Sequence, residues 1–319
     1  ADGLLIEPLT SGDLDRLREQ LETLSPKSVA INLLFSFLDD QYERAIEEVI
    51  PEGIFISRSS AILPEYREYE RGITTWLNAW IGPLVQGYLE RLEQAVSPAM
   101  VTVMQSSGGT IQAGHAGKQA VNMLLSGPAG GLKAAQFISR LVGQEKLMTF
   151  DMGGTSTDVA LIDGDIGLTV EGSMAGYPVA VPMVDMHTIG AGGGSIACLD
   201  EGGLLQVGPH SAGADPGPAC YGRGGIEPTV TDANLILGRL LPDAFLGGKM
   251  KLDVDAAQQA MQPLAEAMQC SAESVAEGII QIANEHMVRA LRVISVQRGI
   301  DPQGLSLMCF GGAGGLHIC

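Results

Sequence analysis

The segment from Met148 to Ile162 constrains the fold of this chain more than any other stretch. An apolar run ends at Asp151, glycines and hydroxyl residues follow, and a second aspartate, Asp158, leads into another apolar run. This order predicts a strand, a tight turn and a second strand. Because glycine has no Cβ, the backbone N–H groups of such a turn can close around a phosphate. A plain Asp-Gly hairpin is the alternative, although it needs neither both hydroxyls nor both carboxylates.

The same segment supplies candidate ligands for a metal ion and for phosphate. Asp151 ends a buried strand, where its carboxylate can hold a magnesium ion directly or through water. Asp158 is the second candidate metal ligand. The candidate phosphate-binding residues are Gly153, Gly154, Thr155 and Thr157.

A second glycine cluster follows a short apolar strand near the end of the sequence. It contains Gly311, Gly312 and Gly314. A strand-Asp-Gly-Gly-Thr turn followed far downstream by a strand-Gly-Gly-x-Gly turn is similar to the ATPase superfamily of actin, Hsp70 and sugar kinases. That resemblance implies that the first turn binds the phosphates of ATP and that the second accepts the adenosine.

Composition excludes several classes of protein. The 319 residues are enough for two domains, and a net charge of −18 argues against binding to nucleic acid or to anionic membrane surfaces. The five cysteines form no CxxC pair, which favours a reducing cytoplasm over a disulfide framework or a zinc ribbon. The P-loop, dinucleotide-binding and HExxH motifs are all missing from the sequence.

Alternation of helical and extended patterns predicts a parallel sheet wrapped by helices. We expect a short strand at 4–6, a long helix over 64–92 that breaks near Gly82 and Pro83, and a functional loop over 208–228. The best domain boundary lies at about residue 145, directly before the strand that leads to Asp151.

A third glycine loop, 190–194, follows a strand that carries Asp185 and His187. On an alternating strand these two side chains face the same side, where they could share a metal or a proton-transfer site. Alternatively, His187 simply bonds a loop carbonyl. Ser195 falls short of a nucleophile elbow, and Asp232 is expected to cap a helix.

Taken together, six segments resemble the hydantoinase A/5-oxoprolinase family, which includes N-methylhydantoinase and acetone carboxylase subunits. They cover essentially the whole chain in order: 104–109, 124–131, 150–158, 187–195, 213–222 and 310–317. The resemblance implies an α/β, actin-like (ribonuclease H-like) ATPase fold with two related mixed-sheet domains around a nucleotide cleft. The domains would be 1–145, the remainder of an N-terminal domain, and 146–319, a partial hydantoinase A/oxoprolinase domain.

The resemblance also implies a function. Its members use ATP, with Mg²⁺, to activate a lactam or imide carbonyl by phosphorylation before the ring opens, or an analogous oxygen before carboxylation. Asp151 would bind the metal, while Asp185 and His187 would face a cyclic amide or ketone substrate. We further expect an oligomer and a hydantoinase B-type partner subunit. Family members carry an additional Asp-Val-Gly-Gly-Thr turn that this sequence lacks, so we expect a fragment, truncated at both ends, that is inactive in isolation.

Three other functions stay open at this point. One is an ATP-dependent ketone carboxylase subunit, and another is a phosphotransferase of the sugar-kinase type. The third is a non-catalytic protein that binds partners under the control of a nucleotide, as actin and Hsp70 do. An ATPase assay with 5-oxoproline, hydantoins or ketones would separate them.

Overall fold

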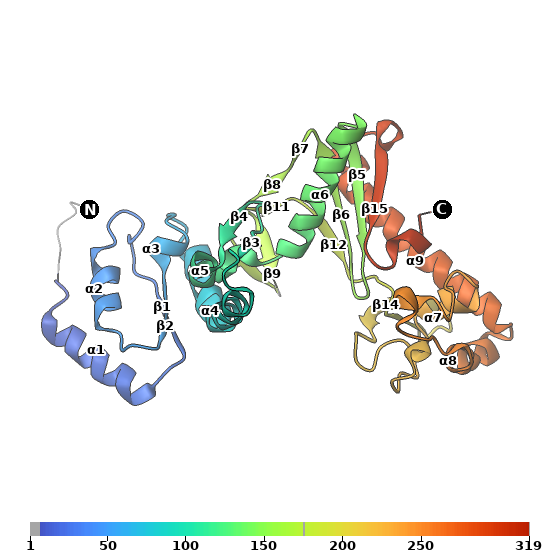
Figure 1. The fold of residues 1–319 in the computed structure, drawn as a ribbon, viewed down its shortest axis with the longest axis horizontal. Coiled ribbons are helices and arrows are strands. Elements are labelled where there is room, and N and C mark those ends of the chain that lie inside the picture. Colours follow the sequence, from blue (N-terminus) through green and yellow to red (C-terminus); the bar gives the residue numbers. More distant parts are fainter. Residues whose placement is uncertain (1–6, 175, 319) are drawn as a thin grey trace. The chain divides into compact units, whose positions relative to one another are not determined.

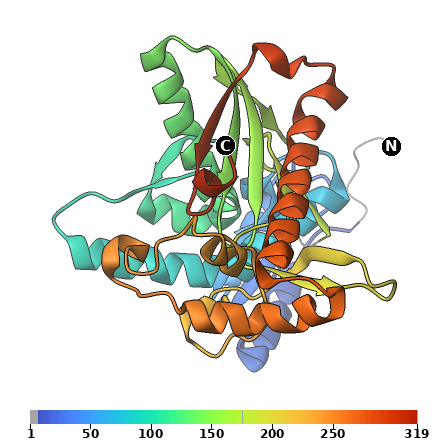
Figure 2. The same cartoon turned by 90° about the vertical axis from the view of Figure 1, so that its right-hand side faces the viewer.

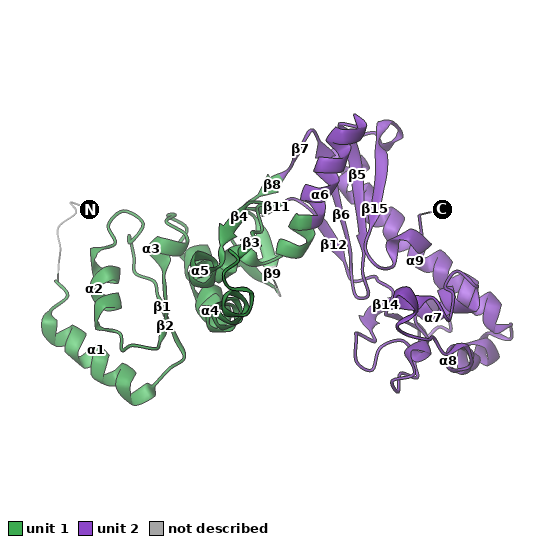
Figure 3. Ribbon diagram, in the orientation of Figure 1, with its two compact units in different colours: residues 1–130, 168–184 green, residues 131–167, 185–319 purple. Residues whose placement is uncertain are grey.

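The computed structural model describes residues 7–174 and 176–318, so the strand expected at 4–6 lies outside the described residues. The chain divides into two compact units (Figure 3). Unit 1 contains residues 1–130 and 168–184, and unit 2 contains residues 131–167 and 185–319. These units are defined by contacts, and the boundary expected near residue 145 stays a prediction.

Unit 1 begins with a capped helix, α1 (Ser11–Leu24). Thr10 is its N-cap, and Asp13 completes a capping box that fixes the start of the helix. Strands β1 (Ser28–Ile31) and β2 (Phe55–Arg58) pair in parallel, and α2 (Gln41–Val49) lies between them in the sequence. The remaining elements are α3 (Ser59–Ile62), β3 (Thr102–Met104), β4 (Thr110–Gln112), α5 (Ala113–Ala116), β8 (Leu168–Thr169), β9 (Gly172–Met174), β10 (Tyr177–Val179) and β11 (Met183–Val184).

The long helix α4 (Glu68–Val96) runs through Pro83 without interruption, so the expected break near Gly82 and Pro83 is wrong. Proline removes one backbone donor, but tertiary packing outweighs this loss. Gly82 is part of that packing, because a Cβ at this position would lie 2.1 Å from the ring of Phe55. Gly82 therefore marks a close contact between the helix and a strand, and the helix does not end there.

Unit 2 is built on one mixed sheet. Strands β5 (Lys146–Met152), β6 (Thr157–Asp163) and β12 (His187–Ile189) form an antiparallel meander, and β15 (Ser306–Phe310) pairs in parallel with β5, which gives the order β12-β6-β5-β15. The short β7 (Asp165–Ile166) folds back and pairs antiparallel with the end of β6. A two-stranded sheet of β13 (Ser195–Leu199) and β14 (Leu205–Ser211) follows, so part of the predicted 208–228 loop is a strand.

Helices cover the two faces of this sheet (Figures 1 and 2). Helix α6 (Ser126–Val142) packs on one face, where Gly131 lies directly against the ring of Phe310. Helix α9 (Ala272–Ile294) covers the other face, and its Ile279, Ile280 and Ala283 share a buried core with Phe150 and Val159. Helices α7 (Val230–Ile236) and α8 (Val254–Met268) pack against α9.

In the part of the chain that the structure describes, no helix combines the length and the apolar character needed to span a membrane.

Candidate functional site

Two carboxylates lie opposite each other at the end of the unit 2 sheet. Asp151 on β5 is the direct cross-strand partner of Asp158 on β6, and Asp158 is in turn the partner of Thr188 on β12. Residues paired in this way project from the same face of a sheet. The Thr188 hydroxyl donates a hydrogen bond of 2.6 Å to Asp158 Oδ1. Among the described residues no donor to the Asp151 carboxylate is recorded.

Burial makes both carboxylates reluctant to ionise. Burial raises the pKa of Asp151 above its usual range, and the neighbouring negative charge of Asp158 raises it further. Burial also raises the pKa of Asp158, while the hydrogen bond from Thr188 lowers it in part. A bound cation would remove this electrostatic penalty. Mg²⁺ commonly binds one or two carboxylates together with phosphate oxygens, so the pair fits that ion. No cluster of three or more potential metal-ligating side chains occurs within residues 7–174 and 176–318.

The turn between β5 and β6 directs unused backbone donors away from the sheet. The Gly153 amide closes the turn by donating to the carbonyl of Ser156, at 3.0 Å. The carbonyls of Gly153 and Gly154 accept hydrogen bonds from the amides of Gly193 and Gly194, at 3.0 and 2.6 Å. For the amides of Gly154 and Thr155, both exposed residues, the described part of the chain provides no recorded acceptor. Such free amides form an anion-binding concavity.

The third glycine loop, 190–194, packs against the turn between β5 and β6. A Cβ on Gly192 would lie 2.7 Å from the backbone of Gly154, so only glycine permits the observed contact. Thr231 then fixes the loop, since its amide and hydroxyl both donate to the carbonyl of Gly193. Ser195 is buried, and its Oγ accepts a hydrogen bond from the Gly192 amide at 2.9 Å. The loop therefore supports the turn, a role that its sequence did not suggest.

Thr157 takes part in the same support. Its side chain is fully buried, and its hydroxyl donates to the carbonyl of Ala191 at 2.6 Å. This hydrogen bond fixes the start of the third glycine loop to β6. The hydroxyl proton is thus already used within the protein, whereas the exposed Thr155 has no recorded side-chain partner among the described residues.

The second glycine turn lies against the carboxylate pair. Phe310 is the strand partner of Asp151, and Gly311 follows with a φ of 88°, in the left-handed region that favours glycine. A Cβ on Gly311 would lie 2.3 Å from Asp151 Oδ1. The Ala313 amide donates to the carbonyl of Met152 at 2.9 Å. The two turns that the sequence singled out therefore meet at one end of the sheet.

The other glycines of the second turn differ in exposure. Gly312 is exposed, with open space where a Cβ would lie, whereas Gly314 is buried against the sulfur of Cys309. His317 anchors the turn, because its Nδ1 lies 2.8 Å from Asn284 Oδ1 and its Nε2 lies 3.2 Å from Asn234 Nδ2. Burial, followed by the positive charge of Arg239, lowers the pKa of His317 to about 4.

Asp185 and His187 are placed apart from the carboxylate pair. Asp185 lies between β11 and β12 and forms an ion pair with Arg298, with Oδ2 2.6 Å from Nη1. His187 is the strand partner of Val159, and so it projects from the α9 face, opposite to the face that carries Asp158. The expectation that Asp185 and His187 face the same side of one strand does not apply, because Asp185 lies outside the strand.

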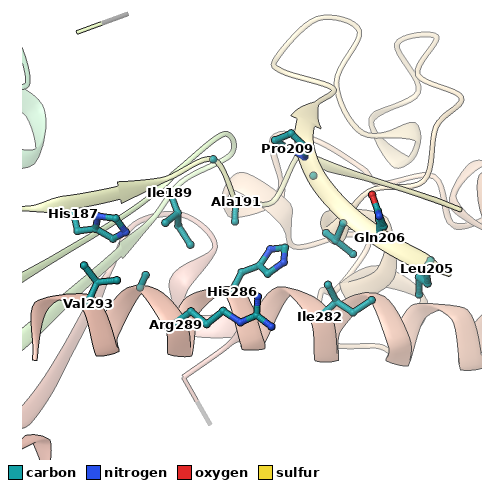
Figure 4. Close-up of a pocket in the computed structure, with 14 residues that line it drawn as sticks. His187, Ile189, Ala191, Leu205, Gln206, Pro209, Ile282, His286, Arg289 and Val293 are labelled. Atoms are coloured by element: carbon teal, nitrogen blue, oxygen red, sulfur yellow. The ribbon is translucent and has the colours of Figure 1, made fainter. Parts of the chain in front are cut away.

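His187 instead lines a cavity of about 580 Å³ between β12, β14 and α9 (Figure 4). Gly190 and Ala191 form another part of its wall. The cavity and the 153–155 turn are therefore connected through the third glycine loop, although they lie on different sides of the sheet.

Sequence reasoning missed several residues of the site. Thr188 contacts Asp158, Thr231 holds the third loop, and Arg298 pairs with Asp185. For Thr188 a signal was available, because it alternates with His187 on a strand and must face the other side. For Arg298 none was available, since it lies 113 residues from Asp185 in the sequence.

Residues 71–319 match the family described as Hydantoinase/oxoprolinase. The chain belongs to this family. It is 38% identical to caprolactamase subunit alpha of Pseudomonas jessenii, with 100% of this chain and 47% of that protein covered. It is 36% identical to 5-oxoprolinase 1 of Arabidopsis thaliana, with 100% and 26% covered. The chain thus spans half or less of the length of these relatives.

A solved structure is also similar. The nucleotide-free structure of acetone carboxylase, from work on ATP-dependent acetone carboxylation, superposes with a TM-score of 0.85 at 28% identity and covers 98% of this chain and 46% of that one. This likeness, together with the strand order of unit 2, confirms the predicted α/β, actin-like fold class.

Proposed function

We propose that this chain is the nucleotide-binding part of an ATP-dependent hydrolase of cyclic amides. One observation carries the proposal: two glycine turns that are distant in sequence meet at the Asp151–Asp158 pair. Names of relatives support the choice of substrate, since caprolactamase and 5-oxoprolinase both denote enzymes that act on lactams. The likeness to acetone carboxylase, whose carboxylation reaction is ATP-dependent, supports the use of ATP.

Each part of the site receives a role in this proposal. Asp151 and Asp158 would hold Mg²⁺, which when bound would supply positive charge to neutralise the phosphates. The Gly154 and Thr155 amides donate to the β- and γ-phosphates, while Gly153 permits the tight turn. Gly311 and Gly312 accept the adenosine, and Gly314 allows close packing beneath it. The Thr157 hydroxyl maintains the third loop through Ala191 and does not contact phosphate.

The chemistry then follows from activation of the amide. Transfer of the γ-phosphoryl group to the lactam oxygen breaks the bond to ADP and converts that oxygen into a good leaving group. Water adds to the carbon and the ring C–N bond breaks, which leaves an acyl phosphate. A second water hydrolyses this acyl phosphate, so ATP, lactam and two waters give ADP, phosphate and an amino acid. Positioning and charge neutralisation supply most of the catalysis in phosphoryl transfer. That Asp185 and His187 face the substrate stays a prediction, and the proposed reaction does not depend on it.

A ketone carboxylase is the second candidate, favoured by the likeness to acetone carboxylase. It shares the first step, phosphorylation of an oxygen, and differs in the acceptor. In either case we propose that a second subunit takes part, because one relative is named as a subunit alpha.

The test measures phosphate release by a full-length protein that contains this chain, with caprolactam, 5-oxoproline or acetone as substrate. We expect a lactam to stimulate ATP hydrolysis, and Asp151→Asn to lower the stimulated rate by at least about a hundredfold, as for the loss of a preorganised charge contact. The matched control is Asp255→Asn, in an exposed first turn of α8. Stimulation by acetone with bicarbonate alone would favour the carboxylase, and stimulation by none of them would contradict both.

A further inference from the structure

The cavity on the α9 face has the dimensions of a small-molecule site. Its volume of about 580 Å³ lies within the usual range for ligand pockets. Aliphatic side chains form most of the wall: Ile189 from β12, Leu205 and Val207 from β14, and Ile282 and Val293 from α9. Because three separate elements contribute, the cavity is an open groove between elements and not a gap beside a single helix.

The ionisable side chains that line this cavity are all basic. His187, His286 and Arg289 carry basic side chains, and Gln206 is neutral, while the lining contains no aspartate or glutamate. Figure 4 shows His286 rising from α9, while the Arg289 side chain lies along the helix with its guanidinium beside the His286 ring. Glu285 lies four residues before Arg289, yet the two side chains form no ion pair in the described part of the chain. This basic lining contrasts with the net charge of −18 for the whole chain.

Burial lowers the pKa of His286, and the charge of Arg289 lowers it further. His286 is therefore neutral at pH 7, where its ring can still donate one hydrogen bond. Arg289 supplies the fixed positive charge, and it is exposed at the mouth of the cavity. An apolar interior with a single cation at its entrance matches a ligand that has an aliphatic body and one anionic end.

We propose that this cavity binds a small aliphatic monocarboxylate, with its chain against Ile189 and Ile282 and its carboxylate at Arg289. This site is distinct from the proposed nucleotide site, because His187 and the Asp151–Asp158 pair project from opposite faces of the sheet. It is nevertheless linked to that site. Its wall includes Ala191, whose carbonyl holds Thr157, and the same loop continues to the amides that hold Gly153 and Gly154.

Hexanoate is a suitable probe, and hexanamide is its neutral counterpart. Both are titrated into the 319-residue chain and followed by the methyl NMR signals of Ile189 and Ile282. We expect saturable shifts with hexanoate, with a dissociation constant on the order of 1 mM for so small a ligand. Binding of hexanamide should be at least about fivefold weaker, because it lacks the charge that pairs with Arg289.

Two variants on the same helix test the assignment. Arg289→Gln should weaken hexanoate about fivefold and leave hexanamide unchanged, whereas Arg292→Gln, at an exposed position that does not line the cavity, should leave both unchanged. Because Arg289 is exposed, its replacement should not affect folding.

Three results would overturn the proposal: no saturable shift with hexanoate, equal binding of hexanoate to the wild type and to the Arg289→Gln variant, or binding of hexanamide as tight as that of hexanoate. The last result would identify a pocket for neutral amides. None of these outcomes depends on ATP turnover, so the proposal can fail while the proposed hydrolase function stands.

Discussion

The aspartates of unit 2 differ in how fully the protein supplies hydrogen-bond donors to their carboxylates. Asp232 at the start of α7 is fully buried and accepts hydrogen bonds from the amides of Ala219, Cys220 and Thr229 and from the Thr229 hydroxyl. Asp151 and Asp158 lie side by side, with Thr188 as the one recorded donor to the pair among the described residues. The first carboxylate is already satisfied by the protein, whereas the pair has capacity left for a ligand.

The number of hydrogen-bond donors around a carboxylate distinguishes structural from functional aspartates more clearly than the position of the aspartate in a sequence motif does. A satisfied carboxylate stabilises the fold and gains nothing from a cation. An unsatisfied, mutually repelling pair costs stability until a cation binds, which is typical of functional sites. If this comparison is right, substitutions in the two regions should change stability in opposite directions.

The largest effect is expected at Asp232. Asp232→Ala leaves the buried Ala219 and Cys220 amides without acceptors and removes half of the capping box with Thr229. We expect a loss of about 3 kcal/mol in the free energy of unfolding, measured by urea denaturation. Asp255→Ala, in the exposed first turn of α8, is the control and should cost no more than about 0.5 kcal/mol. Equal losses for the two variants would break the comparison.

His317 provides a second satisfied group, with a pH signature. Its neutral ring is held by Asn284 and Asn234, and its pKa is about 4 in the folded state against an ordinary value of 6.5. The unfolded state therefore binds more protons between these pH values, so stability falls as the pH drops from about 6.5 toward 4. We expect the wild type to lose about 2 kcal/mol more than His317→Gln between pH 7 and pH 5, in paired urea titrations. Identical pH profiles would show that His317 is not held as a neutral ring.

A smaller change in stability, of opposite sign, is expected at the Asp151–Asp158 pair. Asp158→Asn removes the repulsion with Asp151 and should raise the free energy of unfolding by about 0.5 kcal/mol at pH 7. Because the folded pKa values of the pair are raised, this gain should disappear as the pH falls through them and both carboxyls become protonated.

The same two strands offer the matched control for Asp158. Asp163 is the cross-strand partner of Lys146, at 3.3 Å, so the pair carries opposite charges. Asp163→Asn should produce no gain in stability. A gain there equal to that of Asp158→Asn would mean that the repulsion between Asp151 and Asp158 is not its source.

Sequence reasoning predicted the local parts of this molecule well. The strands around Asp151 and the strand before Gly311 each follow from a continuous local pattern of apolar residues and glycines, and the structure contains them. The meeting of the two glycine turns also followed, since it rests on resemblance to a known ATPase arrangement.

The parts that could not be predicted depend on contacts between distant segments. Which face of the sheet His187 occupies is decided by its register with Val159, and the partner of Asp185 is Arg298 on another element. Similarly, Pro83 suggested a break in a helix that packing keeps continuous, and the requirement for Gly192 appears only when it meets Gly154. No local pattern contains this information.

The most direct test of the central claim measures Mg²⁺-dependent binding of a non-hydrolysable ATP analogue to a full-length protein that contains this chain. Calorimetric titrations with and without Mg²⁺ compare the wild type, Asp151→Asn and the control Asp255→Asn. If the Asp151–Asp158 pair holds the metal beside the phosphates, Mg²⁺ should strengthen binding at least about tenfold in the wild type and the control, and hardly at all in Asp151→Asn, with metal-free affinity unchanged. The same strengthening by Mg²⁺ in all three proteins would contradict the account.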